Sequence, residues 1–161
     1  MSKPKSVIIL DAEGMMVLGA TLGRHVFAGA VIGLTGPMGA GKTTFVRGTA
    51  AGMEIMDGFV VSSPTYTILQ SYPCRKMDLF HLDLFRVSGQ EDLDSTGYRD
   101  AIHDESVLLI EWVDREPDAV PEENLQICLE YGEEGRKVTF LPYGKKYGQL
   151  VNDVIADFTG N

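Results

Sequence analysis

The feature that most constrains this chain is a glycine-rich segment between an apolar run and a stretch of helical character. The segment reads Gly-Pro-Met-Gly-Ala-Gly-Lys-Thr over residues 36–43 and matches the pattern G-x-x-x-x-G-K-[ST] at every defined position. Residues 30–35 fit a buried strand, and residues 42–53 fit a helix. Because a phosphate-binding loop requires a strand before it and a helix after it, a chance glycine-rich turn is the poorer interpretation.

The residue types in this loop suit a nucleoside triphosphate with Mg²⁺. Glycines let consecutive backbone N–H groups face phosphate oxygens, and the following helix adds its positive N-terminal end. Lys42 can reach the β- and γ-phosphates, and the Thr43 hydroxyl can bind Mg²⁺. The sequence lacks the Asn-Lys-x-Asp signature of guanine recognition, which favours ATP. The predicted nucleotide contacts here are Gly36, Met38, Gly39, Ala40, Gly41, Lys42, Thr43 and Thr44.

Two acids that follow apolar runs are candidates for the metal side of the site. Glu111 follows Val-Leu-Leu-Ile, whereas Asp83 ends a weaker run that His81 interrupts. A P-loop enzyme needs a carboxylate at the end of a neighbouring strand. We favour Glu111 as the acid that holds Mg²⁺, directly or through water. Asp83 is then the candidate for orienting the attacking water or the hydration shell of the metal, although the two roles could be exchanged.

Two further features lie close to these motifs. Residues 62–67, Ser-Ser-Pro-Thr-Tyr-Thr, occupy the interval in which GTPase-like proteins carry a switch segment that senses the γ-phosphate. Thr65 or Thr67 could offer a hydroxyl or an N–H group there, but a proline-initiated turn into a strand explains the same residues equally well. Trp112, the only tryptophan, is either a core residue or a neighbour of the nucleotide.

The remaining pattern predicts an α/β fold over residues 1–161, as a single P-loop domain. Strands alternating with helices favour a mostly parallel central sheet flanked by helices. Alternation on both sides of Gly-Glu-Glu-Gly at residues 132–135 predicts a hairpin, and hence antiparallel strands toward the C-terminus. The other expected strands are 6–10, 66–72, 77–87, 107–113, 125–131 and 137–141, and the other expected helices are 11–28, capped by Asp11, 89–102 and 146–158.

Charge and hydropathy exclude some classes of function. A net charge of −9 argues against tight, independent binding to nucleic acid, which needs a basic footprint. It permits a basic protein partner, or a nucleic-acid role inside a larger complex. No apolar run approaches the roughly 18 residues of a membrane helix, so we expect a cytoplasmic protein without a membrane role. The cysteines and histidines show no metal-binding spacing.

Taken together, these motifs resemble the TsaE (YjeE) family, the bacterial P-loop ATPases of tRNA threonylcarbamoyladenosine synthesis. The resemblance rests on residues 36–45, on Ser-Pro-Thr-Tyr-Thr at 63–67, on His-Leu-Asp-Leu-Phe-Arg at 81–86 and on Leu-Ile-Glu-Trp at 109–112. It implies ATP hydrolysis at a low intrinsic rate that partners stimulate. It also implies action with TsaD and TsaB proteins, which carry out the carbamoyl transfer to adenosine, so that tRNA is met only indirectly through the complex.

The resemblance also implies roles for individual residues. Lys42 would bind phosphates, while Thr43 and Glu111 would bind Mg²⁺. Asp83 would be required for activity, and the segment containing Thr65 would act as the switch.

The last implied contact is on the adenine side. Arg136 would lie where the family chain returns toward the adenine. Two departures from the family pattern are Pro37, where an acid is frequent, and Met15 with Met16, where polar residues are more frequent. The phosphate chemistry depends on neither departure.

Two other functions stay open from the residues alone. One is a small-molecule kinase, and the other is a nucleotide-dependent interaction switch without useful turnover. A kinase needs an acceptor pocket and usually an arginine-rich lid. Arginines are few and dispersed here, and Arg86 and Arg99 are the nearest candidates.

Overall fold

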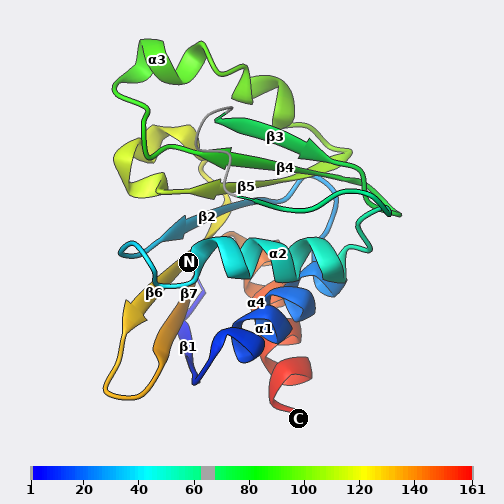
Figure 1. The fold of residues 1–161 in the computed structure, drawn as a ribbon, viewed down its shortest axis with the longest axis vertical. Coiled ribbons are helices and arrows are strands. Elements are labelled where there is room, and N and C mark those ends of the chain that lie inside the picture. The colour runs from blue at the N-terminus through cyan, green and yellow to red at the C-terminus, as the bar shows by residue number, and fades with distance from the viewer. Residues whose placement is uncertain (1, 63–67, 161) are drawn as a thin grey trace.

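The computed structural model describes residues 2–62 and 68–160, and in these residues one mixed sheet carries helices on both faces (Figure 1). Its strand order is β1-β7-β6-β2-β5-β4-β3. The strands are β1 Lys5–Ile9, β2 Val31–Thr35, β3 Leu69–Tyr72, β4 Asp78–Asp83, β5 Ser106–Glu111, β6 Asn124–Tyr131 and β7 Arg136–Tyr143. The helices are α1 Ala12–His25, α2 Lys42–Gly52, α3 Gln90–Asp94 and α4 Lys145–Thr159, with short 3-10 turns η1 Tyr98–Ala101, η2 Val113–Arg115 and η3 Pro117–Ala119.

The centre of the sheet is parallel, which confirms the predicted α/β class. Strands β4, β5, β2 and β6 run in the same direction, so their carboxyl ends meet at one edge. Strands β6 and β7 form the predicted antiparallel hairpin, and β1 extends it. Strand β3 is also antiparallel, on the opposite edge beside β4.

Each face of the sheet has its own apolar core. Alternate residues of the central strands, such as Leu109 and Leu34, pack on one side with α1, α2 and α4. Their neighbours, such as Leu108 and Ile110, pack on the other side with α3 and η1. Strands buried on both faces in this way produce the continuous apolar runs seen in the sequence. The first face matters most here because α2, which begins at the glycine-rich loop, packs on it.

Several predicted elements are shorter or divided in the structure. The helix expected over residues 89–102 is interrupted at Gly97, whose φ of 77° is left-handed, and divides into α3 and η1. Strand β4 ends at Asp83 because its Oδ1 accepts a hydrogen bond from the Phe85 N–H at 2.9 Å and the chain turns. Strand β5 ends at Glu111 because Trp112 has a φ of 59°.

Helix α1 begins as predicted. Asp11 caps it by accepting a hydrogen bond from the Gly14 N–H at 2.8 Å. The helix ends at His25, three residues before the predicted end. No helix in the described part of the chain is long and apolar enough to cross a membrane.

Glycines set the close approach of α1 to α2. Gly19 and Gly23 of α1 face Gly48 and Gly52 of α2. A Cβ on Gly48 would lie 2.3 Å from the Met16 carbonyl oxygen, a separation that real Cβ atoms do not show. The helices can therefore touch backbone to backbone only because these side chains are absent, and this contact fixes the helix that carries Lys42.

This contact predicts that Gly48→Ala destabilises the folded protein, although a glycine-to-alanine change normally stabilises a helix. In an isolated helix the change would stabilise by about 1 kcal/mol. Here it forces α1 away from α2, and we expect a net destabilisation of about 1–3 kcal/mol, measured by thermal or denaturant unfolding. Gly14→Ala in α1 is the matched control, because the nearest atoms to an added Cβ there are the side-chain atoms Asp11 Oδ1 and Ile9 Cγ2, both at 3.3 Å. A stabilisation of both variants would contradict the assigned packing.

Candidate functional site

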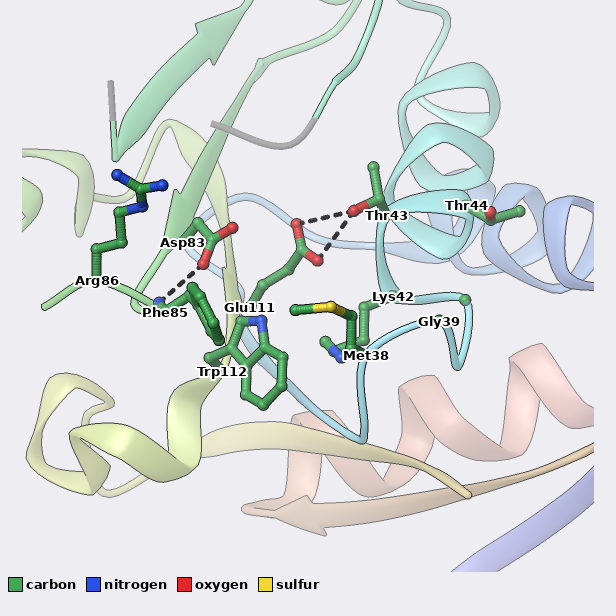
Figure 2. A pocket seen from close by; sticks show the side chains of 11 residues that line it. Met38, Gly39, Lys42, Thr43, Thr44, Asp83, Phe85, Arg86, Glu111 and Trp112 are labelled. Atoms are coloured by element: carbon green, nitrogen blue, oxygen red, sulfur yellow. Dashed lines mark hydrogen bonds between the residues drawn. The ribbon is translucent and has the colours of Figure 1, made fainter. Parts of the chain in front are cut away.

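The candidate site lies where the parallel strands end. The glycine-rich loop follows β2, Asp83 ends β4 and Glu111 ends β5. Glu111 is in register with both Leu34 and Asp83, so these three segments leave the sheet side by side. They surround a pocket of about 490 Å³ (Figure 2). Its lining residues are Met38, Gly39, Gly41, Lys42, Thr43, Thr44, Asp83, Phe85, Arg86, Glu111 and Trp112.

The loop has a conformation that favours glycine, as Gly36 and Gly41 illustrate. Gly36 has a φ of 146°, and a Cβ there would lie 2.5 Å from the Leu129 carbonyl oxygen of β6. Gly41 has a φ of 110° and precedes the first residue of α2. None of the described side chains caps this helix. Its first N–H groups and its positive end are therefore suited to an anionic ligand.

Lys42 is folded back onto its own loop. Its Nζ donates to the carbonyl oxygens of Gly36 at 2.6 Å and Pro37 at 2.9 Å, and lies 4.1 Å from the centroid of the Trp112 ring. Burial lowers the pKa of Lys42, and the nearby carboxylates of Glu111 and Asp83 oppose that shift. The loop thus keeps a cation inside the pocket.

Glu111 receives hydrogen bonds from two sides. The Thr43 hydroxyl donates to Oε1 at 3.1 Å, a contact that Figure 2 shows. The His81 Nε2 lies 2.5 Å from Oε2. Glu111 is 2 % exposed and His81 is fully buried, so both interactions are shielded from water. The structure thus brings the Thr43 hydroxyl and the Glu111 carboxylate together, and their binding of Mg²⁺ stays a prediction.

Asp83 lies next to Glu111 at the end of the adjacent strand and is 5 % exposed. The bond from the Phe85 N–H fixes the orientation of its carboxylate. The two carboxylates are therefore close together in one pocket but have different hydrogen-bond partners. Their division of roles stays a prediction.

Two aromatic residues form one wall of the pocket. The rings of Phe85 and Trp112 are 5.1 Å apart, and the left-handed backbone of Trp112 turns the chain directly after Glu111. Trp112 is partly buried against the apolar core and also lines the pocket. Trp112 therefore lies between the core and the pocket, and its proximity to a nucleotide stays a prediction.

A second, smaller pocket lies on the other side of the loop. It has a volume of about 200 Å³ and shares Gly39, Gly41 and Thr44 with the first pocket. Arg136 lines it, and its Nη2 donates to the Gly39 carbonyl oxygen at 3.4 Å. The Arg136 guanidinium lies 4.2 Å from the Tyr131 ring centroid. The remaining lining residues are Ile9, Leu10, Asp11, Ala12, Met15, Ala40 and Gly135.

The predicted nucleotide-binding residues divide between these pockets. Met38, Lys42 and Thr43 line the first, whereas Ala40 and Arg136 line only the second. Gly36 lines neither pocket, but it accepts a hydrogen bond from Lys42. The proposed switch residues Thr65 and Thr67 lie outside the described residues.

Sequence reasoning missed the part played by His81, which it treated as an interruption of an apolar run. The available signal was the two-residue spacing of His81 and Asp83, which places both on one face of a strand. Recognising a contact to Glu111 also required the pairing of β4 with β5.

A sequence model described as "Threonylcarbamoyl adenosine biosynthesis protein TsaE" matches residues 9–138. The chain belongs to the TsaE family. A TsaE of Bacillus subtilis is 35 % identical over 127 residues, which cover 78 % of each protein. A TsaE of a Nostoc species is 36 % identical over 149 residues, or 90 % of each. Both are named as tRNA threonylcarbamoyladenosine biosynthesis proteins.

The TsaE assignment agrees with a solved structure. The crystal structure of Bacillus subtilis YdiB matches this chain with a TM-score of 0.82 at 28 % identity. The match covers 98 % of this chain and 97 % of that one. It therefore includes the sheet, α1, α2 and the hairpin that together surround the two pockets.

Proposed function

We propose that this chain is the Mg²⁺-dependent, ATP-binding and ATP-hydrolysing subunit of a tRNA threonylcarbamoyladenosine machinery. The observation that carries this proposal is the Thr43 hydroxyl of the glycine-rich loop, 3.1 Å from the Glu111 carboxylate within one pocket. The names of the relatives supply the pathway. Low intrinsic turnover, and a location in the cytoplasm, are parts of the same proposal.

The residues present suit a nucleotide with Mg²⁺. A hydroxyl and a carboxylate are oxygen donors of the kind that Mg²⁺ prefers. The described residues contain no group of three or more His, Cys, Asp or Glu side chains that could hold a metal by themselves. This pattern fits an ion that keeps several waters and shares the phosphates of a nucleotide. When bound, Mg²⁺ would neutralise charge on the phosphate oxygens.

In this proposal the residues of the first pocket have separate tasks. Lys42 leaves the carbonyl oxygens of its own loop and binds phosphate. Thr43 and Glu111 hold Mg²⁺. Asp83, whose orientation the Phe85 N–H fixes, positions the water that attacks the terminal phosphate.

The second pocket is suited to the base of the nucleotide. It continues from the loop through Gly39 and Thr44, and Leu10 and Met15 give it apolar walls. The Arg136 guanidinium, held over the Tyr131 ring, can stack on a planar base. Adenine therefore has an apolar, partly cationic site next to the phosphate loop.

The partners belong to the proposal as well. TsaD- and TsaB-like proteins would carry out the transfer chemistry and handle the tRNA. The net charge of −9 supports this division, because an acidic chain repels the phosphate backbone.

A phosphate-release assay tests the function. Purified protein with ATP and Mg²⁺ should release phosphate slowly without any acceptor molecule, and faster when its TsaD- and TsaB-like partners are added. A small-molecule kinase would instead form a labelled product only with an acceptor and would ignore the partners. An interaction switch would bind ATP and release no phosphate.

The arginines do not assemble a kinase-like lid in the described residues. Arg86 lines the pocket, but Arg99 forms an ion pair with Asp94 at 3.2 Å and does not line the pocket. This arrangement supports hydrolysis over transfer to a metabolite.

A further inference from the structure

His81 is a fully buried histidine in the second-last strand of the sheet, and none of the tasks above uses it. Its Nε2 lies 2.5 Å from Glu111 Oε2. Its other ring nitrogen, Nδ1, is buried and has no hydrogen-bond partner among the described residues. A buried histidine with only a structural role would be more stable if both ring nitrogens had hydrogen-bond partners. Among the described residues, the hydrogen-bond partner of this ring is Glu111, the acid that also contacts Thr43.

The strand pairing explains why this contact is firm. His81 is opposite Leu109 of β5, and Glu111 lies two residues further along the same face. On its other side His81 pairs with Gln70 of β3. Because neighbouring strands hold β4 on both sides, the position of the ring is set by the sheet and does not depend on a flexible loop.

The Glu111 carboxylate is consequently held between two donors. Nε2–H of His81 donates to Oε2, and the Thr43 hydroxyl donates to Oε1. The Thr43 hydroxyl also lies 3.5 Å from Oε2, so Oε1 is the oxygen nearer to the glycine-rich loop and Oε2 is the one bonded from the sheet side. Without the histidine, a buried carboxylate oxygen would lack its donor, and the side chain would turn to find another.

We propose that His81 is a positioning residue that aims the Glu111 carboxylate at Thr43 and at the Mg²⁺ shared with a nucleotide. This inference rests on the proposed function, because it assumes that Glu111 faces a metal. It assigns to His81 a role in metal affinity and none in phosphate binding, which belongs to Lys42 and the loop N–H groups.

Two affinities distinguish this role from a general loss of structure, which would weaken both together. They are the affinity for Mg²⁺ and the affinity for nucleotide without Mg²⁺. Loss of the His81 donor should weaken Mg²⁺ binding in the nucleotide complex. Nucleotide affinity in the presence of EDTA should stay unchanged, because no contact of the loop with phosphate involves the ring. Residues that orient metal ligands typically contribute about 10–100-fold to metal affinity.

His81→Gln and His81→Asn form a matched pair of variants. A glutamine amide nitrogen can occupy the place of Nε2, whereas the shorter asparagine amide reaches only the place of Nδ1. The probe is ADP, which avoids turnover, and the signal is the fluorescence of Trp112, the only tryptophan and a pocket residue. ADP is titrated first in EDTA, and Mg²⁺ is then titrated at saturating ADP.

We expect His81→Asn to raise the Mg²⁺ midpoint about 10-fold or more, and His81→Gln to stay within about 3-fold of the wild-type midpoint. Both variants should bind ADP normally in EDTA. Equal impairment of the two variants, or no impairment of either, overturns the proposal. If the wild type binds no ADP or shows no response to Mg²⁺, the proposed function fails first and this inference fails with it.

A second measurement on the wild type covers the case in which His81→Asn does not fold. The chain has three histidines, so the ring nitrogens can be assigned by NMR with ¹⁵N-labelled histidine. We expect a slowly exchanging Nε2–H on His81 that shifts on addition of ADP with Mg²⁺ and less on addition of ADP alone. A proton on Nδ1 only, or signals that Mg²⁺ leaves unchanged, overturns the proposal.

Discussion

Lys42→Ala is expected to remove nucleotide binding and to lower turnover by about 100-fold or more, while the fold is kept. The lysine is the cation of the glycine-rich loop, and its Nζ sits on the loop carbonyl oxygens, next to the space where phosphate would lie. Its removal leaves the carboxylates of Glu111 and Asp83 in the pocket without the positive charge of Lys42, which interacts with both of them. A polyanion would then be repelled from the site.

The lowered pKa of Lys42 indicates why the fold should survive this change. Burial lowers that pKa below 10.5, so the folded state disfavours the charged form more than the unfolded chain does. At neutral pH the charge therefore contributes no net stability, so its loss alone should not unfold the protein.

Lys145→Ala is the matched control for this variant. Lys145 is the first residue of α4 and follows a glycine, as Lys42 follows Gly41 at the start of α2, but it is exposed. Calorimetric titration and a phosphate-release assay should find Lys145→Ala normal. Wild-type turnover in Lys42→Ala would mean that the site has been assigned to the wrong loop.

The second large effect is that substitutions of Glu111 and Asp83 should change different measured quantities. Glu111→Gln should raise the Mg²⁺ concentration needed for nucleotide binding by about 10-fold or more, because the amide lacks the charge that faces Thr43 and the metal. Asp83→Asn should leave this Mg²⁺ midpoint near the wild-type value and lower turnover by about 100-fold or more, as expected for a residue that orients the attacking water.

Amide replacements are preferred to alanine because both side chains are almost fully buried and alanine would leave cavities. The readouts are a Mg²⁺ titration at saturating ADP and phosphate release at saturating Mg²⁺. If Asp83→Asn shifts the Mg²⁺ midpoint and Glu111→Gln affects only turnover, the two residues exchange their roles.

Local chemistry made the glycine-rich loop and its flanking elements predictable. Asp11 caps α1 through a side-chain bond within three residues, and the glycines of residues 36–41 act through their own backbone angles. Continuous apolar runs identified β2 and β5 because both strands are buried on both faces. Information confined to neighbouring residues was sufficient for each of these.

The other features depend on residues distant in sequence. The contact of His81 with Glu111 needs the register of β4 against β5. The glycines of α1 and α2 read as helix-weakening positions until the two helices are seen to touch. Arg136 meets the loop only because the β6–β7 hairpin turns back toward it. The division of α3 from η1 followed from Gly97, whose left-handed backbone outweighed the helical pattern around it.

Calorimetric titration of the wild-type protein with ATP, in the presence and absence of Mg²⁺, tests whether the pocket at the ends of β2, β4 and β5 binds a nucleotide. We expect saturable binding of one ATP per chain, tighter with Mg²⁺ than with EDTA, and weaker binding of GTP. No saturable binding of ATP at millimolar concentration by the folded protein would contradict it, because the loop, Thr43 and Glu111 would then be arranged around a site that takes no nucleotide.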